Sequence, residues 1–380
     1  MNGQIVVLLL EDNPSDAEFV RIALAENNGV SFRLTVVNRL ADAVVLLHRT
    51  KVDVVLLDLG LPDSQGLATL QRVYQVCELD TAIVVLTGNE DEELGPQTLQ
   101  LGAQDYLNKK HITNGGALTR SMRYGYERKQ REQMERQFAQ AQRSFEAARA
   151  IQQYLLPKRA PLLPGFDIFG TCQPADATGG DFFDYIPMAN GCLGITVADV
   201  ASHGFGPALI MAGTRRALRT LAKTNVDPGS VLTLVNEAVC EDTDPERFVT
   251  MFLASLDPAG RQFSYAGAGH NAHLLDADGR VTHLAASGIP LGLLEDCVYV
   301  SGGCLPLERG QILLLMSDGI QEAQASDGSQ FGMQTALDYI REFRTHCAQA
   351  IVEGLISTVR QFCHPAKPLD DMTVVVVKIG

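Results

Sequence analysis

Acidic side chains follow the first and third of the short aliphatic runs in the N-terminal third of the chain. Glu11 and Asp12 come directly after Ile5–Leu10, and Asp58 ends the run that begins at Asp53. The carboxyl ends of parallel strands meet at one edge of a sheet, so these three carboxylates are predicted to lie together. Three negative charges would repel one another without a cation between them, and Mg²⁺ suits such hard oxygen ligands.

A hydroxyl and an ammonium group are predicted at the same edge. Thr87 ends the fourth run, and Lys109 comes just after the fifth, Gln104–Leu107. A lysine opposite the metal can neutralise a phosphoryl group, and a threonine there can hydrogen-bond it. Asp58, held in this way, is suited to accept a phosphoryl group.

A second group of aspartates stands where strands end or turns begin in the C-terminal half: Asp181, Asp199, Asp318 and the neighbours Asp370 and Asp371. One Asp-Gly by itself is usually only a turn. Four such places in one domain favour a metal cluster, and all-oxygen ligation favours Mg²⁺ or Mn²⁺ over zinc. Two such ions about 3.5–4 Å apart can lower the pKa of a shared water, which becomes a nucleophile at neutral pH.

The elements that must position the first group alternate along residues 1–115. Apolar runs that suit parallel strands buried on both faces are Ile5–Leu10, Asp53–Leu57 and Ala82–Leu86. Amphipathic, helix-like stretches are Ala17–Asn27, Leu40–His48 and Gly66–Cys77. This alternation predicts a doubly wound α/β domain.

Residues 118–156 are predicted to form one long helix. Residues 120–150 contain eight basic and four acidic side chains, which favours a solvated face over a nucleic-acid patch. A heptad seam about three repeats long is formed by Met134, Phe138, Ala141, Phe145, Ala148, Gln152 and Leu155. The seam favours a dimerising coiled coil; the alternative is a helix that lies on its own domains.

Strand-like segments dominate after Pro157: Cys192–Ala198, Phe248–Leu256, Gln262–Ala266, His273–Asp276, Gln311–Met316 and Met372–Ile379. Helical stretches are Pro207–Ala222, Gly229–Cys240, Met333–Phe343 and Ala348–Cys363. Many strands with helices in pairs predict an α+β domain or a helix-covered sandwich. The expected boundaries are residues 1–120, 121–156 for the linker helix and 157–380.

Composition narrows the classes of protein. The net charge of −14 over 380 residues is unfavourable for nucleic-acid binding. No apolar run approaches the roughly 20 residues of a membrane-spanning helix, and the N-terminus lacks the features of a signal peptide. The eight cysteines form no C-x-x-C pair, so we expect reduced thiols in the cytoplasm.

The first domain resembles the receiver domain of two-component response regulators. The stretches that match are Leu10–Asn13, Leu57–Asp63, Leu86–Gly88 and Asp105–Lys109. The resemblance implies a flavodoxin-like, five-stranded parallel sheet and a sensor histidine kinase as phosphoryl donor. It implies Asp58 as the phosphorylation site, Glu11 and Asp12 as Mg²⁺ ligands with Asp58, Lys109 as the phosphate partner, and Thr87 and Tyr106 as switch residues. Lys110 stands where receivers commonly have proline.

The last domain is similar to the PPM family of metal-dependent Ser/Thr phosphatases, in the branch of the stage II sporulation phosphatase. The stretches that match are Ala148–Pro157, Phe263–Asn271 and Gly288–Gly292. The resemblance implies a β-sandwich flanked by helices and two Mn²⁺ or Mg²⁺ ions. It implies Asp181 and Asp199 as ligands of both ions, helped by the Val200 carbonyl or bound water, and Asp318 and Asp370 as the acids that complete the site.

Other residues near these motifs are left open. Asp370 is chosen over Asp371 because it matches the first acid of the family's Asp-Asp/Asn-x-Thr motif. Asp184 and His203 could support the ligands, whereas loop packing is the simpler interpretation of His203 and His270. Ser202 stands where the family often has glycine.

The favoured function is a response regulator whose phosphorylation controls a phosphoserine/phosphothreonine phosphatase. The resemblance alone suggests an anti-sigma-factor antagonist as substrate. The alternative is a receiver-controlled protein that sequesters a partner without catalysis. A nucleotide cyclase is disfavoured because Gly179–Phe183 lacks the glutamate of the Gly-Gly-Asp-Glu-Phe loop. We expect phosphorylation of Asp58 to draw Thr87 inward, repack Tyr106 and alter helix pairing in a homodimer.

Overall fold

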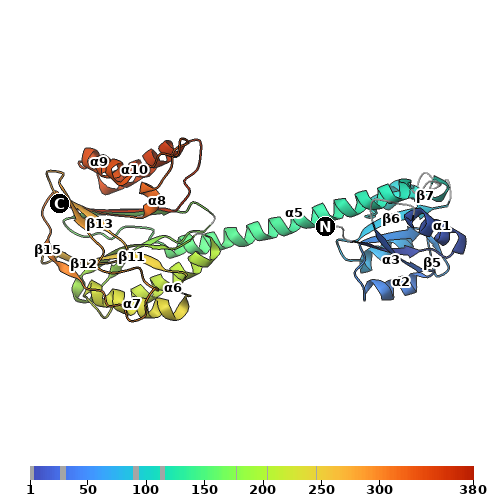
Figure 1. Cartoon of the computed structure of the whole chain (residues 1–380), viewed down its shortest axis with the longest axis horizontal. Coiled ribbons are helices and arrows are strands. Elements are labelled where there is room, and N and C mark those ends of the chain that lie inside the picture. Colours follow the sequence, from blue (N-terminus) through green and yellow to red (C-terminus); the bar gives the residue numbers. More distant parts are fainter. Residues whose placement is uncertain are drawn as a thin grey trace. The chain divides into compact units, whose positions relative to one another are not determined.

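The computed structural model describes residues 4–25, 31–88, 94–111, 116–176, 178–202, 204–244 and 246–380. The chain divides into two compact units, an N-terminal unit (Met1–Gln142) and a C-terminal unit (Arg143–Gly380). The helix α5 (Gly116–Leu155) begins in the first and ends in the second (Figure 1). Among the helices described, none has both the length and the apolar character needed to cross a membrane.

The N-terminal unit contains a five-stranded sheet in which every neighbouring pair is parallel. Its strands are β1 (Ile5–Leu10), β2 (Phe32–Val37), β3 (Val54–Asp58), β6 (Ala82–Thr87) and β7 (Asp105–Asn108). Their order, β2-β1-β3-β6-β7, is the doubly wound order of flavodoxin-like folds, which places ligands at the carboxyl ends of the strands. The predicted parallel α/β architecture is confirmed.

Helices cover both faces of this sheet. The elements are α1 (Pro14–Ala25), α2 (Leu40–Leu47), α3 (Leu67–Val76), α4 (Leu94–Gln100), the hairpin β4 (Gly60–Leu61) and β5 (Ser64–Gln65), and the short 3₁₀ turn η1 (Lys109–His111). One core joins the sheet to α1 and the start of α5, and a second joins it to α2 and α3. The Asp63 carboxylate accepts hydrogen bonds from the Leu40 and Ala41 amides, which ties the β4–β5 hairpin to the start of α2.

The C-terminal unit contains two five-stranded antiparallel sheets. The first has the order β15-β12-β11-β10-β9: β9 (Phe182–Pro187), β10 (Leu193–Val200), β11 (Val249–Asp257), β12 (Gln262–Ala268) and β15 (Gly302–Pro306). The second has the order β14-β13-β16-β17-β8: β8 (Phe166–Gln173), β13 (Ala272–Leu275), β14 (Val281–Leu284), β16 (Ile312–Met316) and β17 (Met372–Ile379). The inner faces share one apolar core, so the sheets form a sandwich.

Helices cover the two outer faces of the sandwich (Figure 1). On the first sheet lie α6 (Phe205–Leu221) and α7 (Pro228–Asp242); the second carries α8 (Asp318–Gln321), α9 (Met333–Phe343) and α10 (Ala348–Cys363). A 3₁₀ turn, η2 (Ala189–Gly191), joins β9 to β10. The helix-covered sandwich is thus the form that the predicted α+β domain takes.

Most predicted strands and helices occur within a few residues of their expected bounds, and β17, α9 and α10 match residue for residue. In the C-terminal unit, the strands outside the predicted runs are β8, β9, β14 and β15, and all four are edge strands of the two sheets. In the N-terminal unit, the edge strand β2 and the hairpin β4–β5 lie outside the predicted runs. Edge strands are covered on fewer sides, so they need no continuous apolar run. In β9 the run is broken by Asp184.

Candidate functional site

The acidic edge of the N-terminal unit brings together the predicted carboxylates. One oxygen from each of Glu11, Asp12 and Asp58 lies within 4.8 Å of the other two. Glu11 is buried, Asp58 half-buried and Asp12 exposed, so the cluster opens toward solvent. The carboxylates come from the ends of β1 and β3, as the parallel order requires. Their donor set and spacing fit a divalent cation such as Mg²⁺.

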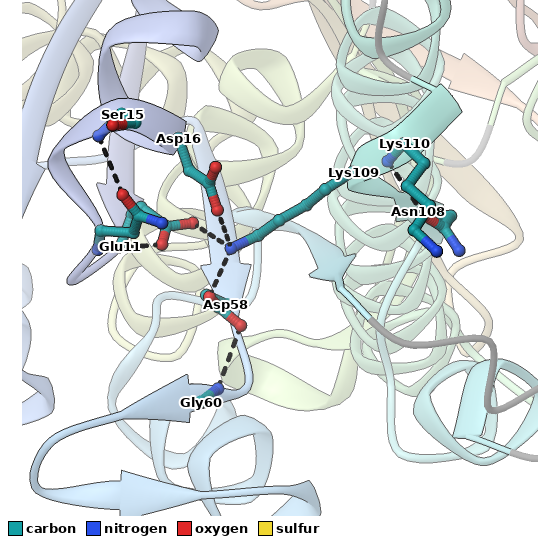
Figure 2. Close-up of polar contacts among 9 residues, drawn as sticks. Glu11, Ser15, Asp16, Asp58, Gly60, Asn108, Lys109 and Lys110 are labelled. Carbon is teal, nitrogen blue, oxygen red and sulfur yellow. Dashed lines mark hydrogen bonds and ion pairs between the residues drawn. The ribbon is translucent and has the colours of Figure 1, made fainter.

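Lys109 lies at the centre of the same edge (Figure 2). Its Nζ lies 2.5 Å from Asp58 Oδ2, 2.6 Å from Glu11 Oε2 and 2.9 Å from Asp16 Oδ2. Although burial opposes it, hydrogen bonding to these carboxylates raises the pKa of Lys109 above its ordinary value. Burial raises the pKa of Glu11, to which the charge of Asp58 adds, while Lys109 opposes the shift. Asp16 is a contact that sequence spacing did not predict.

The predicted switch residues lie on β6, which borders the strand of Asp58, and on β7, the next strand along the sheet. Thr87 is the last residue of β6 and pairs in register with Asn108 of β7. Tyr106 is 40% exposed, and its ring lies against Gly95 of α4, where any side chain would collide with it. Thr87 and Tyr106 therefore link the acidic edge to the surface beside α4.

The acids of the C-terminal unit come from both sheets. Asp181 immediately precedes β9 and Asp199 lies in β10, both in the first sheet. Asp318 opens α8 directly after β16, and Asp370 stands just before β17, in the second sheet. The Val200 carbonyl lies close to Gly180, beside Asp181, where a Cβ would come within 2.7 Å of its oxygen. The predicted group is therefore assembled at one end of the sandwich.

Mutual repulsion among these acids appears in their pKa values. Burial, with the charges of Asp318 and Asp370, raises the pKa of Asp199 to about 7. Burial and the charge of Asp199 also raise the pKa of Asp181, and Oδ2 of Asp181 is buried without a hydrogen-bond partner among the described residues. Burial and the charge of Asp370 raise the pKa of Asp318. Asp181 is buried, and Asp199 and Asp318 are half-buried. Carboxylates that repel one another and lose contact with water in this way fit divalent cations, which would remove both penalties.

The neighbours Asp370 and Asp371 have different surroundings. Asp370 is exposed at the rim, whereas Asp371 is 4% exposed. Oδ1 of Asp371 accepts a hydrogen bond from the Ala175 amide at 2.8 Å, and Oδ2 accepts one from the Asp181 amide at 3.3 Å. Asp371 therefore holds the loop that carries Asp181, a contact that the sequence alone did not reveal.

Three other residues considered from the sequence lie in different places. Asp184 is fully buried and forms ion pairs with Arg215 and Arg219 of α6, which ties that helix to β9. His270 is buried; one ring nitrogen contacts Thr250 and the other the Met316 carbonyl, each at 3.0 Å. His203 lies outside the described residues. A cavity of about 450 Å³ lies beside the acids, with Asp199, Asp318 and His270 in its wall.

The predicted seam of α5 is exposed along most of its length. Met134, Phe138 and Phe145 are 67%, 73% and 46% exposed. Exposed large apolar side chains at heptad spacing are typical of an interface between helices. At Gln152 the seam is no longer exposed and apolar: this residue is polar and buried, and its side chain hydrogen-bonds to Gly179.

Comparisons with known proteins match two separate parts of the chain to two different families. Residues 7–115 match the response regulator receiver domain family, and residues 189–380 match the family of stage II sporulation protein E. The chain is 30% identical over 237 residues to phosphoserine phosphatase RsbU of Bacillus subtilis, covering 62% of this chain and 69% of that protein. It is 27% identical over 190 residues to phosphoserine phosphatase RsbP of the same organism, covering 48% of this chain and 46% of that protein.

Solved structures agree with the fold of the C-terminal unit. The SiaA-PP2C domain of Pseudomonas aeruginosa superposes with a TM-score of 0.57 at 25% identity, over 64% of this chain and 98% of that domain. The sandwich with helices on both outer faces is therefore the architecture of PP2C-type phosphatases.

Proposed function

The chain belongs to the stage II sporulation protein E family of Ser/Thr protein phosphatases and carries a response-regulator receiver domain, and from this we propose that phosphorylation of Asp58 controls hydrolysis of a phosphoprotein. The proposed domains are the receiver (1–120), the linker helix (121–156) and the phosphatase (157–380). The observation that carries the catalytic part is the group of mutually repelling aspartates around Asp181, which is buried and has one oxygen without a hydrogen-bond partner among the described residues.

We assign the residues of the phosphatase site by chemistry and position. Asp181, Asp199, Asp318 and Asp370, with the Val200 carbonyl, would hold two Mn²⁺ or Mg²⁺ ions. When bound, such ions supply an activated water and neutralise the charge of a phosphate. Asp371 orients the loop of Asp181 through backbone hydrogen bonds. The cavity beside Asp199 and Asp318 gives a phosphorylated side chain room to reach the acids.

Hydrolysis of a phosphoserine peptide with added Mn²⁺ tests this assignment. Asp199→Ala and Asp318→Ala should each lower kcat by more than about 100-fold, the upper end of losses from outer-shell changes at metal sites. Asp338→Ala, a matched change on the exposed face of α9, should leave turnover unchanged. Absence of metal-dependent turnover in the unsubstituted protein would instead favour the sequestering function.

The receiver assignment follows from the edge around Lys109. Asp58 would take the phosphoryl group from a sensor histidine kinase, with Mg²⁺ held by Glu11, Asp12 and Asp58. Lys109 would then contact the added phosphoryl oxygens, and Thr87 would move toward them, freeing space into which Tyr106 can repack. The contact of Tyr106 with Gly95 supports this, because a shift of the ring changes the surface beside α4.

The linker is proposed to pair with the linker of a second copy of this chain. The exposed seam residues Met134, Phe138 and Phe145 support a homodimer, because three large apolar side chains on one helix face are costly to leave in water. Deleting residues 138–144 removes one heptad and keeps the phase of the helix. If control by Asp58 phosphorylation survives this deletion unchanged, regulation through helix pairing is wrong.

The substrate and the compartment complete the proposal. RsbU and RsbP are named as phosphoserine phosphatases, and the likeness to them supports a phosphoserine substrate, for which we propose an anti-sigma-factor antagonist. All eight cysteines are free, which supports a reducing, cytoplasmic location. Dephosphorylation of candidate antagonist proteins by the purified chain, followed by mass spectrometry, tests the substrate.

A further inference from the structure

We propose that Gln152, in the last turn of α5, is a positioning residue that holds the metal-binding loop of the phosphatase site. Gln152 is 6% exposed. Its Nε2 donates a hydrogen bond to the Gly179 carbonyl at 2.5 Å, and its Oε1 accepts one from the Gly179 amide at 3.1 Å. One side-chain amide thus satisfies both backbone groups of a single loop residue. This inference rests on the proposed phosphatase function.

The opposite side of the same loop is held by Asp371. A Cβ at Gly179 would lie 2.0 Å from Asp371 Oδ2, so only glycine allows the loop to pass between the two side chains. Asp371 accepts hydrogen bonds from the backbone amides of Ala175 and Asp181. Between these two residues, Gln152 hydrogen-bonds to the backbone carbonyl and amide of Gly179. The loop that ends in Asp181 is therefore clamped between the linker helix and the start of β17.

The position of this clamp relative to the acids gives it a role in metal binding. Gly179 stands two residues before Asp181, whose Oδ2 has no hydrogen-bond partner among the described residues. A ligand oxygen of this kind is useful only if its backbone is fixed, since outer contacts of metal ligands set their orientation. Loss of the Gln152 amide would leave two buried backbone groups of Gly179 unpaired and free the loop to shift.

The residue type at position 152 is not what helix packing alone would select. Gln152 continues the seam of Met134, Phe138 and Phe145, where an apolar side chain would be the ordinary choice. A buried glutamine is costly unless both ends of its amide are bonded, and here both are. The next residue, Gln153, is exposed on the same helix, so the chain supplies a matched control.

Calorimetric titration of the full-length protein with Mn²⁺ tests the inference directly. All proteins carry Asp12→Ala, so that the receiver edge contributes less to the titration. Gln152→Leu should raise the Mn²⁺ dissociation constant of the phosphatase site by about 10-fold to 100-fold, as for other outer contacts of metal ligands. Gln153→Leu should leave this constant unchanged. With p-nitrophenyl phosphate, excess Mn²⁺ should restore kcat of Gln152→Leu without changing KM.

Other results would overturn the positioning role. If Gln152→Leu binds Mn²⁺ as tightly as Gln153→Leu, the clamp does not serve the metal site. A loss of kcat that excess Mn²⁺ does not restore, together with a lower unfolding temperature in EDTA, would show a structural role only. If Gln152→Leu fails to fold, Gln152→Glu serves instead: it keeps the acceptor for the Gly179 amide but sets a carboxylate against the carbonyl. Unchanged Mn²⁺ binding by Gln152→Glu would then refute the inference.

The same titration separates this inference from the proposed function. If the protein with Gln152 intact binds no Mn²⁺ beyond the receiver edge and hydrolyses no phosphoester, the phosphatase assignment itself fails, and the positioning role falls with it. If that protein binds Mn²⁺ and is active while Gln152→Leu is indistinguishable from it, the positioning role alone is wrong.

Discussion

Lys109 Nζ lies 2.5 Å from Oδ2 of Asp58, although 51 residues separate the two in the chain. Asp58 ends β3 and Lys109 follows β7, two strands that both border β6. The second oxygen of Asp58, Oδ1, accepts a hydrogen bond from the Gly60 amide at 3.0 Å (Figure 2). The carboxylate is therefore held between a cation and a backbone amide at the open edge of the sheet, where a phosphoryl donor can approach.

Replacing Asp58 by Asn should abolish phosphorylation of the receiver. An amide oxygen is a much weaker nucleophile than a carboxylate, so Asp58→Asn should take up no phosphoryl group from acetyl phosphate in Mg²⁺. Intact-protein mass spectrometry measures the uptake. The exposed Asp42→Asn of α2 is the control and should be phosphorylated normally. Uptake by Asp58→Asn equal to that of the control would place the acceptor elsewhere.

Replacing Asp184 by Asn should destabilise the phosphatase domain strongly. Asp184 is fully buried, and its carboxylate lies 2.9 Å from Arg215 and 3.0 Å from Arg219. Removing one partner of a buried ion pair typically costs about 3–5 kcal/mol, because the remaining charges lose their counter-ion. Urea unfolding measures this loss. Asp338→Asn, which breaks the exposed pair with Arg341, should cost less than about 1 kcal/mol, and equal losses would contradict this account.

Protonation of His270 should destabilise the phosphatase domain in mild acid. Burial lowers the pKa of His270 from 6.5 to about 4. As the pH falls, the imidazole of the unfolded chain is therefore protonated at a higher pH than that of the folded domain. The stability that neutral His270 provides is complete above pH 6.5 and is lost as the pH falls toward 4, by roughly 3 kcal/mol.

The measurement compares urea unfolding of the unsubstituted protein and His270→Gln at pH 7.5 and pH 5. Glutamine can hydrogen-bond to Thr250 and the Met316 carbonyl but does not titrate, so its acid destabilisation should be smaller. His346→Gln, at an exposed position of the same domain, should follow the unsubstituted protein. An identical pH dependence in all three proteins would mean that His270 does not titrate on unfolding.

Replacing Ser202 by Gly should stabilise the turn after β10. Ser202 has φ +76°, a left-handed conformation that costs a residue with a Cβ roughly 1–2 kcal/mol. Glycine removes this cost, but it increases the conformational entropy of the unfolded chain, which lowers stability by about 0.5–1 kcal/mol. We expect a net gain of about 0.5–1 kcal/mol and a Tm higher by about 2 °C. The control is Ser326→Gly, which should lower Tm because φ of Ser326 is not positive. If Ser202→Gly also lowers Tm, the backbone of Ser202 is not strained.

The sequence alone was sufficient to predict which carboxylates meet at the acidic edge of the receiver. Glu11, Asp58 and Thr87 each directly follow an apolar run, and parallel order brings the carboxyl ends of such runs together. The central strands could be predicted in the same way, because burial on both faces leaves a continuous apolar run, and most helices could be predicted from their amphipathic pattern. The edge strands β8, β9, β14 and β15 could not, because partial exposure or one buried charge removes that signal.

What the tertiary structure alone decided concerns neighbours of the same residue type. Asp370 faces the rim and Asp371 the loop of Asp181; Gln152 is buried and Gln153 exposed. Sequence patterns fixed the kind of side chain, but not which of two identical neighbours points inward. That choice depends on contacts between distant segments: Gln152 bonds to a residue 27 positions away, and Asp371 to one 196 positions away. Only the packing of helix, loop and strand against one another creates those contacts.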